Sequence, residues 1–309
     1  MLLFISRKNT CFVTFQVKAL AFILLVLYNI DILRRGEKVK HAALIIDIKN
    51  SRKMDNEKRQ DYQVKIKQTL DFLNDLCSKA IKYKVVFSLG DSVQGMFYSV
   101  NDAIGYFDLL KNLVYPLEIR CGIGYGEIYV DMEEFDSNMQ DGPAYHNARS
   151  ALDLCKDANL NLVIVDYRCD IFVNEIYKVI KIMENRGSNK RKDVYNLINM
   201  LYPYTFNKLN KEKYFQKIHT YILSNIHYYD KINVDNIGIK ELANLDMEVD
   251  QKIKSILPDV SIPPSLSLLI GNILGTTREN IRQMIEVGEM NQIRNLKVLC
   301  DKFIKTKGS

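Results

Sequence analysis

The order of short apolar segments between residues 41 and 165 constrains the fold of this chain more than any other feature. Residues 41–48 are rich in Ile and Leu and carry Asp47 near their end, a pattern typical of a buried central strand that ends in a carboxylate. The residues that follow predict, in order, a helix over 64–81, strands over 84–89 and 93–98, a helix over 101–113, a strand pair over 117–130, a helix over 144–155 and a strand over 160–165. We therefore expect one α+β domain in this part of the chain.

Strand-helix-strand-strand-helix-strand is the order of the ferredoxin-like split unit, in which an antiparallel sheet carries its helices on one face. In that topology, the end of the first strand lies beside the turn between the second and third strands. The segment Gly90-Asp91-Ser92 is expected to form this turn. Asp47 and Asp91 should therefore meet, although they are far apart in the sequence.

Two carboxylates that meet repel each other unless a cation lies between them. Hard oxygen ligands of this kind suit Mg²⁺ or Mn²⁺, and a pair of such ions can hold a triphosphate and activate an attacking hydroxyl. Each aspartate also has an ordinary structural interpretation, because Asp47 could cap the next helix and Asp91 could simply form a hairpin turn. The two together favour a metal site, since perturbed carboxylate pairs concentrate at functional sites.

Four ordered segments resemble the motifs of SatD-family proteins, namely residues 43–52 (ALIIDIKNSR), 88–97 (SLGDSVQGMF), 119–128 (IRCGIGYGEI) and 141–149 (DGPAYHNAR). These motifs are in turn similar to those of class III adenylyl and guanylyl cyclases, in which two strand-end aspartates bind the metal ions. The resemblance implies a nucleotide cyclase-like palm domain. It also implies that Asp47 and Asp91 are metal ligands and that the backbone carbonyl of Ile48 is a further metal contact.

The same resemblance assigns roles to other residues. Arg149 lies near the position of a cyclase arginine that stabilises negative charge on the phosphates, a role that suits a planar and permanently charged side chain. The residues expected to contact the nucleotide are Lys49, Asn50, Ser51, Gly90 and Asn147. The implied ligand is a nucleoside triphosphate of unknown base with Mg²⁺ or Mn²⁺, and the implied assembly is a homodimer, because cyclase-like sites form between two palms. The implied activity is that of a phosphorus-oxygen lyase or a nucleotidyltransferase.

Two positions depart from the cyclase pattern. Tyr145 replaces the asparagine that orients the ribose, and Phe87 replaces the lysine that selects the purine. Asn147 and His146 are candidate substitutes for the missing asparagine, although their places on the predicted helix aim them differently. Cyclisation, hydrolysis and binding without chemistry therefore all stay open.

Glycines alternate through the predicted strand near residue 120, at Gly122, Gly124 and Gly126. A period of two within a strand is not the pattern of a dinucleotide-binding loop. We expect these glycines to allow a close backbone approach, either across a dimer or to a ligand.

After residue 166 the pattern becomes helical, with helices expected over 193–201, 211–226 and 239–257 and a solvated basic loop over 186–192. In residues 265–287, Gly275 and two threonines separate two short helices, which is typical of a helix-turn-helix. Its second helix would present to DNA the side chains of Arg278, Asn280, Arg282 and Gln283. An ordinary helical hairpin fits this pattern nearly as well. Arg294 and Lys297 are expected to add positive potential to the last helix.

The expected domains are a hydrophobic extension at 1–38, a palm domain at 39–170, a helical connection at 171–205 and an all-α domain at 206–309 with the helix-turn-helix at 265–287. The apolar run 19–29 is shorter than the roughly 20 residues that span a bilayer, so the extension is either a weak membrane anchor or a misassigned start, and we expect a cytoplasmic protein. The net charge of +6 is too small to argue for nucleic-acid binding. The alternative function is a DNA-binding regulator whose palm only dimerises or senses a nucleotide.

Overall fold

The computed structural model of the protein describes residues 39–88, 90–129, 136–204, 213–214, 217–218, 221 and 261–307. The predicted N-terminal extension at 1–38, most of the predicted helix at 211–226 and the predicted helix at 239–257 lie outside the described residues. No described helix is both long and apolar enough to cross a membrane.

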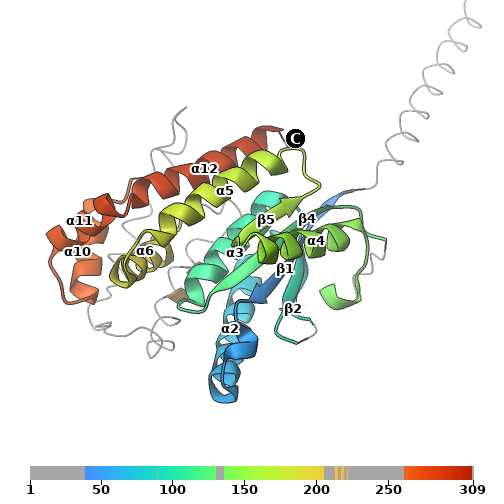
Figure 1. Cartoon of the computed structure of the whole chain (residues 1–309), viewed down its shortest axis with the longest axis horizontal. Helices are drawn as coiled ribbons and strands as arrows, with labels where there is room; N and C mark the ends of the chain where they lie inside the picture. The colour runs from blue at the N-terminus through green and yellow to red at the C-terminus, as the bar shows by residue number, and fades with distance from the viewer. Residues whose placement is uncertain are drawn as a thin grey trace, which may run out of the picture. The chain divides into compact units, whose positions relative to one another are not determined.

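A five-stranded sheet forms the centre of the fold (Figure 1). Its strands are β1 (His41–Ile48), β2 (Ile81–Phe87), β3 (Val93–Phe97), β4 (Ile119–Gly126) and β5 (Leu162–Val165), in the order β2-β3-β1-β4-β5. The first four strands pair antiparallel, as expected from the split unit. The mixed α+β fold is therefore confirmed.

Two details of the predicted sheet are wrong. The strand pair predicted over 117–130 is a single strand, β4, within the described residues. In addition, β5 runs parallel to β4, with Cys121 opposite Leu162 and Gly124 opposite Val165. The chain reaches β5 through the helix α4 (Pro143–Asp157), and a helix is the usual connection between neighbouring parallel strands.

Helices cover both faces of the sheet. On one face, Ala42, Leu44 and Ile46 of β1 belong to a core cluster shared with α2 (Asn56–Leu76) and α3 (Val100–Leu113). On the other face, Ala43 and Ile45 pack in a separate cluster that contains residues of α4. The expectation of helices on one face therefore holds for α2 and α3 but not for α4. The cause lies in β1, which is apolar at successive positions and so is buried on both sides.

The alternating glycines of β4 let α4 lie directly on the sheet. A Cβ atom added to Gly122, Gly124 or Gly126 would come within 3.0 Å of backbone atoms of α4. The close backbone approach expected from the sequence is present. Its partner, however, is a helix of the same chain and not a second protomer or a ligand.

The C-terminal helices pack beside the sheet domain. They are α5 (Asp170–Asn185), α6 (Asn189–Leu201), α10 (Pro264–Ile273), α11 (Arg278–Val287) and α12 (Met290–Lys307), and the chain also has short 3-10 helices η1 (Ser51–Lys53) and η2 (Ser137–Met139). Helix α12 lies alongside α5 and also contacts α3 (Figure 1). Arg294 and Lys297 of α12 are 0% and 3% exposed, so the expectation that they add positive surface potential is wrong. They face inward because carboxylates and aromatic rings of α3, α5 and the segment after α6 receive them.

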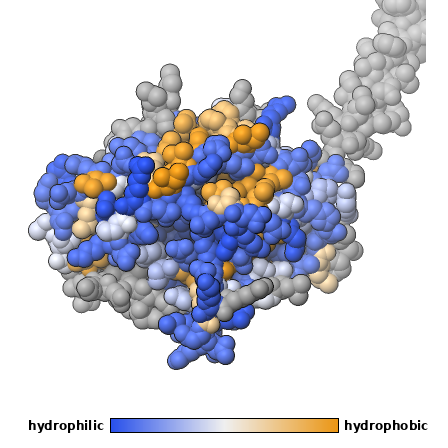
Figure 2. Space-filling view, viewed as in Figure 1, coloured by the Kyte–Doolittle hydropathy of each residue, from blue (hydrophilic) through white to orange (hydrophobic). Residues whose placement is uncertain are grey.

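One face of α5 carries apolar side chains that are open to solvent. The larger ones are Ile171, Phe172, Val179 and Ile182, and Leu299 of α12 is also exposed. Figure 2 shows apolar residues gathered over this part of the molecule.

Candidate functional site

The pairing of β1 with its neighbours brings the two predicted metal aspartates to one end of the sheet. Ile46 lies opposite Val93, so Asp47 is one residue beyond this pair on β1 and Asp91 is two residues before it on the β3 side. The cap of α2 is Asp55, whose carboxylate accepts a hydrogen bond of 2.8 Å from the backbone N–H of Lys58. Asp47 is therefore not the cap of the next helix, which removes one of its ordinary interpretations.

The two aspartates have different electrostatic surroundings. Asp47 lies opposite Arg120 on β4, and Arg120 Nε is 3.5 Å from Asp47 Oδ2. The Nε atom of Arg120 is buried and forms no hydrogen bond with a described residue. Asp91 sits in the β2–β3 turn, partly exposed, and has no ion-pair partner within the described part of the chain.

The donor set at this end of the sheet suits a hydrated divalent ion. Among the described residues, no three His, Cys, Asp or Glu side chains gather around one point, so the protein ligands would be the two carboxylates and the carbonyl of Ile48. Mg²⁺ commonly takes one or two carboxylates and fills its remaining positions with water or phosphate oxygens. A divalent ion would have to compete with Arg120 for Asp47.

Most of the other predicted nucleotide contacts lie at the same end. Lys49 donates a hydrogen bond of 2.7 Å to Asn161 Oδ1, and its ammonium is 3.6 Å from Glu118 Oε2. Asn50 follows in the left-handed region with φ 59° and leads into η1, where Ser51 is buried. Gly90 has φ +77° and open space around the position of a Cβ atom, so a ligand could approach its backbone closely.

Asn147 and Arg149 lie elsewhere. Asn147 Nδ2 donates hydrogen bonds of 3.0 Å to the carbonyl of Tyr125 and 3.2 Å to the carboxylate of Asp166. Because Tyr125 pairs with Ala42 at the start of β1, Asn147 is at the opposite end of the sheet from Asp47. Arg149 is exposed on α4. One chain alone therefore does not bring Asn147 to the aspartates.

The two departures from the cyclase pattern are residues of the core. Tyr145 is buried in the cluster beneath α4, and burial raises the pKa of its phenol. Phe87 is partly buried and packs on the larger cluster. Both positions therefore hold packing side chains where a cyclase has polar ligand contacts.

The predicted DNA contacts are on the surface. The short connection between α10 and α11 contains Gly275 with φ +62°, and Thr277 caps α11. The four candidate side chains on α11, Arg278, Asn280, Arg282 and Gln283, are exposed. Arg282 lies 3.5 Å from Glu279 and 3.7 Å from Glu286, so this face of α11 carries charges of both signs.

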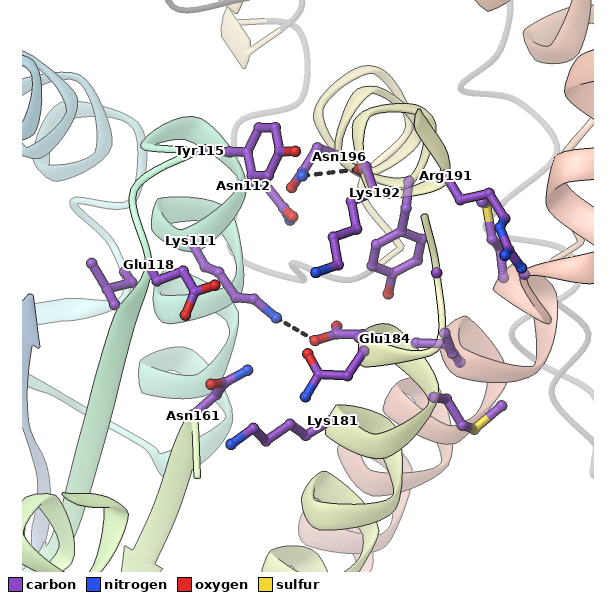
Figure 3. A pocket seen from close by; sticks show the side chains of 18 of the residues that line it. Lys111, Asn112, Tyr115, Glu118, Asn161, Lys181, Glu184, Arg191, Lys192 and Asn196 are labelled. Carbon is purple, nitrogen blue, oxygen red and sulfur yellow. Dashed lines mark hydrogen bonds and ion pairs between the residues drawn. The ribbon is translucent and has the colours of Figure 1, made fainter. Parts of the chain in front are cut away.

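A pocket of about 340 Å³ lies next to the end of β1, on the side of β4 and away from Asp91 (Figure 3). The sequence analysis did not predict it. Its walls are formed by Lys49 after β1, the end of α3 with the α3–β4 connection, the α4–β5 connection, α5 with α6, and the residues around the start of α12. The only signal in the sequence was the basic run 186–192, which we expected to be a solvated loop. From Asn189 onward that run is instead the first turn of α6, and Arg191 and Lys192 line the pocket.

Comparison with known proteins assigns the family. The model of the SatD family matches residues 41–221. The chain belongs to the SatD family. Two solved structures, each of a bacterial light-regulated adenylyl cyclase, are similar to this SatD-family chain with a TM-score of 0.30. One is 14% identical over 41% of this chain and 75% of its own, and the other is 12% identical over 47% and 54%. No curated protein matches the chain.

Proposed function

We propose that this SatD-family protein binds a nucleoside triphosphate together with Mg²⁺ or Mn²⁺ at the end of β1 and the β2–β3 turn. The observation that carries the proposal is the strand register, which brings Asp47 and Asp91 to one end of the sheet. Asp47, Asp91 and the carbonyl of Ile48 would hold the ion. Asn50, Ser51 and the backbone at Gly90 would contact the phosphates from the same end.

A bound divalent ion would neutralise the two carboxylates and polarise the phosphate oxygens of the nucleotide. Within the protein, Arg120 has a second part in this scheme. Arg120 neutralises Asp47 when no ion is bound. Once an ion binds Asp47, the Nε–H of Arg120 would be available to donate a hydrogen bond to a phosphate oxygen.

Phosphoryl transfer is a further step of the proposal. Arg149 is exposed on α4 and forms no hydrogen bond or ion pair with either aspartate of its own chain, so it would act on the nucleotide of a second copy. That requirement is the reason to propose a homodimer. Tyr145 is buried and leaves the ribose without its cyclase partner, so binding is better supported than ring closure.

Isothermal titration of the full-length protein with ATP and GTP, with and without Mg²⁺ or Mn²⁺, tests the proposal. We expect metal-dependent binding that weakens about tenfold or more in Asp47→Ala and Asp91→Ala, since each change removes a charged ligand. Asp71→Ala is the matched control, because Asp71 is exposed on α2 and pairs only with Lys67. Metal-independent binding, or equal affinities in all three variants, would contradict the site. Chromatography of the mixture then identifies any cyclic or hydrolysed product.

The second candidate function is DNA binding by α11, favoured by the exposure of its four polar candidates. Phosphate contacts make such binding fall steeply with salt. We expect fluorescence anisotropy with duplex DNA to detect it only at low salt, and Arg278→Ala with Arg282→Ala to abolish it. Binding that survives this double change rules out α11 as the DNA-reading helix.

A further inference from the structure

The pocket beside the end of β1 carries an excess of positive charge. Its walls include five cationic side chains, Lys49, Lys111, Lys181, Arg191 and Lys192, and two carboxylates, Glu118 and Glu184. Five asparagine amides and two tyrosines complete the polar lining, at positions 112, 159, 161, 185 and 196 and positions 115 and 195. A pocket of about 340 Å³ is within the size range of small-molecule sites.

The carboxylates of the pocket are already engaged. Lys111 Nζ is 2.6 Å from Glu184 Oε2, and the buried Lys297 approaches the same carboxylate from the other side at 3.6 Å. Glu118 is 3.6 Å from Lys49. Lys181, Arg191 and Lys192 therefore remain without an ion-pair partner within 4.0 Å among the described residues. Figure 3 shows Lys181 and Lys192 extending from α5 and α6 toward the space around the Lys111–Glu184 pair.

Like charges crowd one another in this pocket. Burial lowers the pKa of Lys181, Glu118 partly opposes this shift, and the neighbouring Arg120 and Lys111 lower the pKa further. A protein gains stability when an anion enters such a site, because the anion relieves the repulsion between the cations.

Two buried polar atoms of the lining form no hydrogen bond with a described residue. They are the hydroxyl of Tyr195 and Glu184 Oε1, and the latter lies 3.6 Å from the ammonium of Lys297. Native proteins leave few buried polar atoms unsatisfied, and those that remain commonly await a ligand or water. The hydroxyl and the asparagine amides suit the uncharged polar part of a ligand.

We propose that this pocket binds a small phosphorylated molecule with two or three negative charges, without a metal ion. A single carboxylate would leave most of the surplus cations unpaired, whereas a phosphate ester near neutral pH brings almost two charges and several acceptor oxygens. Lysine ammonium groups bind phosphate as point charges. This site differs from the proposed metal site, because it lies on the β4–β5 side of β1 whereas Asp91 lies on the β3 side.

Calorimetric titration of the full-length protein with inorganic pyrophosphate in EDTA and low salt tests the proposal. We expect saturable binding that weakens about tenfold or more in Lys181→Ala/Lys192→Ala, which removes two charge-assisted contacts. The matched control is Lys178→Ala/Lys190→Ala. It removes the same charges from the same two helices, but Lys178 and Lys190 are exposed and neither lines the pocket.

The outcomes are distinct. Absence of pyrophosphate binding, or an equal loss in both double variants, overturns the proposal, because an equal loss means that only net charge matters. Thermal unfolding with and without pyrophosphate gives a second readout, in which the ligand should raise the midpoint of the control variant but not of Lys181→Ala/Lys192→Ala. Asp47→Ala should bind pyrophosphate normally in EDTA, so failure of the metal site and failure of this pocket give different results.

Discussion

Two clusters of charge meet at α5, and they differ in how their lysines are neutralised. In the buried cluster, the ammonium of Lys297 lies 2.8 Å from the carboxylate of Asp108 and 3.6 Å from that of Glu184. Lys111 forms a second ion pair with Glu184. Two lysines thus face two carboxylates. In the pocket cluster described above, Lys181 and its cationic neighbours outnumber the available carboxylates.

The pKa values of the lysines shift in opposite directions in these two clusters. Burial opposes the charge of Lys297, but Asp108, Tyr195 and Glu184 together outweigh burial and raise the pKa of Lys297 above its ordinary value. The pKa of Lys181 is lowered by burial and by neighbouring cations. Asp108 is also well satisfied, since its Oδ2 atom accepts hydrogen bonds from the hydroxyls of Tyr177 and Tyr204. We infer that the buried cluster holds α12 in place, whereas the pocket cluster lacks the counter-charge that a ligand would supply.

The largest effect should come from breaking the buried cluster. Lys297→Met leaves Asp108 and one side of Glu184 without a cation in the interior, and removal of one partner of a buried pair typically costs about 3–5 kcal/mol. Urea unfolding at neutral pH measures this loss of unfolding free energy. Lys305→Met is the control on the same helix, because Lys305 is exposed and pairs with Asp301 one turn away. Equal losses in the two variants would show that the buried cluster contributes no net stability.

Lys65 on α2 gives a third lysine environment to compare with these two clusters. It is 1% exposed and donates a hydrogen bond of 2.7 Å to the carbonyl of Tyr115. Burial lowers the pKa of Lys65 to about 7. The unfolded chain, in which Lys65 has its ordinary pKa of 10.5, therefore binds more protons than the folded chain between these two values. Stability should accordingly rise as the pH rises from about 7 to about 10.5 and be lowest below that window.

Lys65→Met tests this effect. Each pKa unit corresponds to about 1.4 kcal/mol, and loss of the hydrogen bond to Tyr115 offsets part of the gain, so we expect a gain of roughly 2 kcal/mol at pH 7. The gain should disappear toward pH 10.5, where the wild-type amine is neutral in both states. Chemical unfolding across this range checks the prediction. A variant whose stability gain does not change with pH would mean that Lys65 does not titrate near neutrality.

The sheet could be predicted because its signals are local. Short apolar runs and the Gly90 turn gave β1, β2 and β3 to within a few residues, and the split-unit order then gave their pairing. The direction of β5 depended on where α4 packs, which no local pattern records. The burial of Lys297 was missed for the same reason, since its partner Asp108 is 189 residues away in the sequence.

The two candidate sites differ in the same way. Asp47 and Asp91 each end a recognisable segment, so the topology was enough to bring them to one end of the sheet. The basic pocket draws its lining from five separate parts of the chain, and each lysine taken alone is typical of a solvated surface. Only the packing of α5 and α6 against the α3–β4 connection turns these residues into a cavity.

The smallest effect should come from relieving one charge in the pocket. Lys181→Ala removes a charge that burial disfavours and that Arg120 and Lys111 repel, with Glu118 offsetting part of the effect. Partly exposed charges interact by about 0.2–1 kcal/mol, so the ligand-free protein should become more stable by an amount of this size. Added salt should shrink the gain, because screening weakens the repulsion that the change removes. Lys178→Ala is the control, since Lys178 lies one turn earlier on α5 and faces Glu175. In saturating pyrophosphate the sign should reverse, because the wild-type protein then gains a contact that Lys181→Ala lacks. Thermal unfolding of both variants with and without pyrophosphate measures all of these changes, and a gain that persists with ligand would mean that Lys181 repels its neighbours without binding the anion.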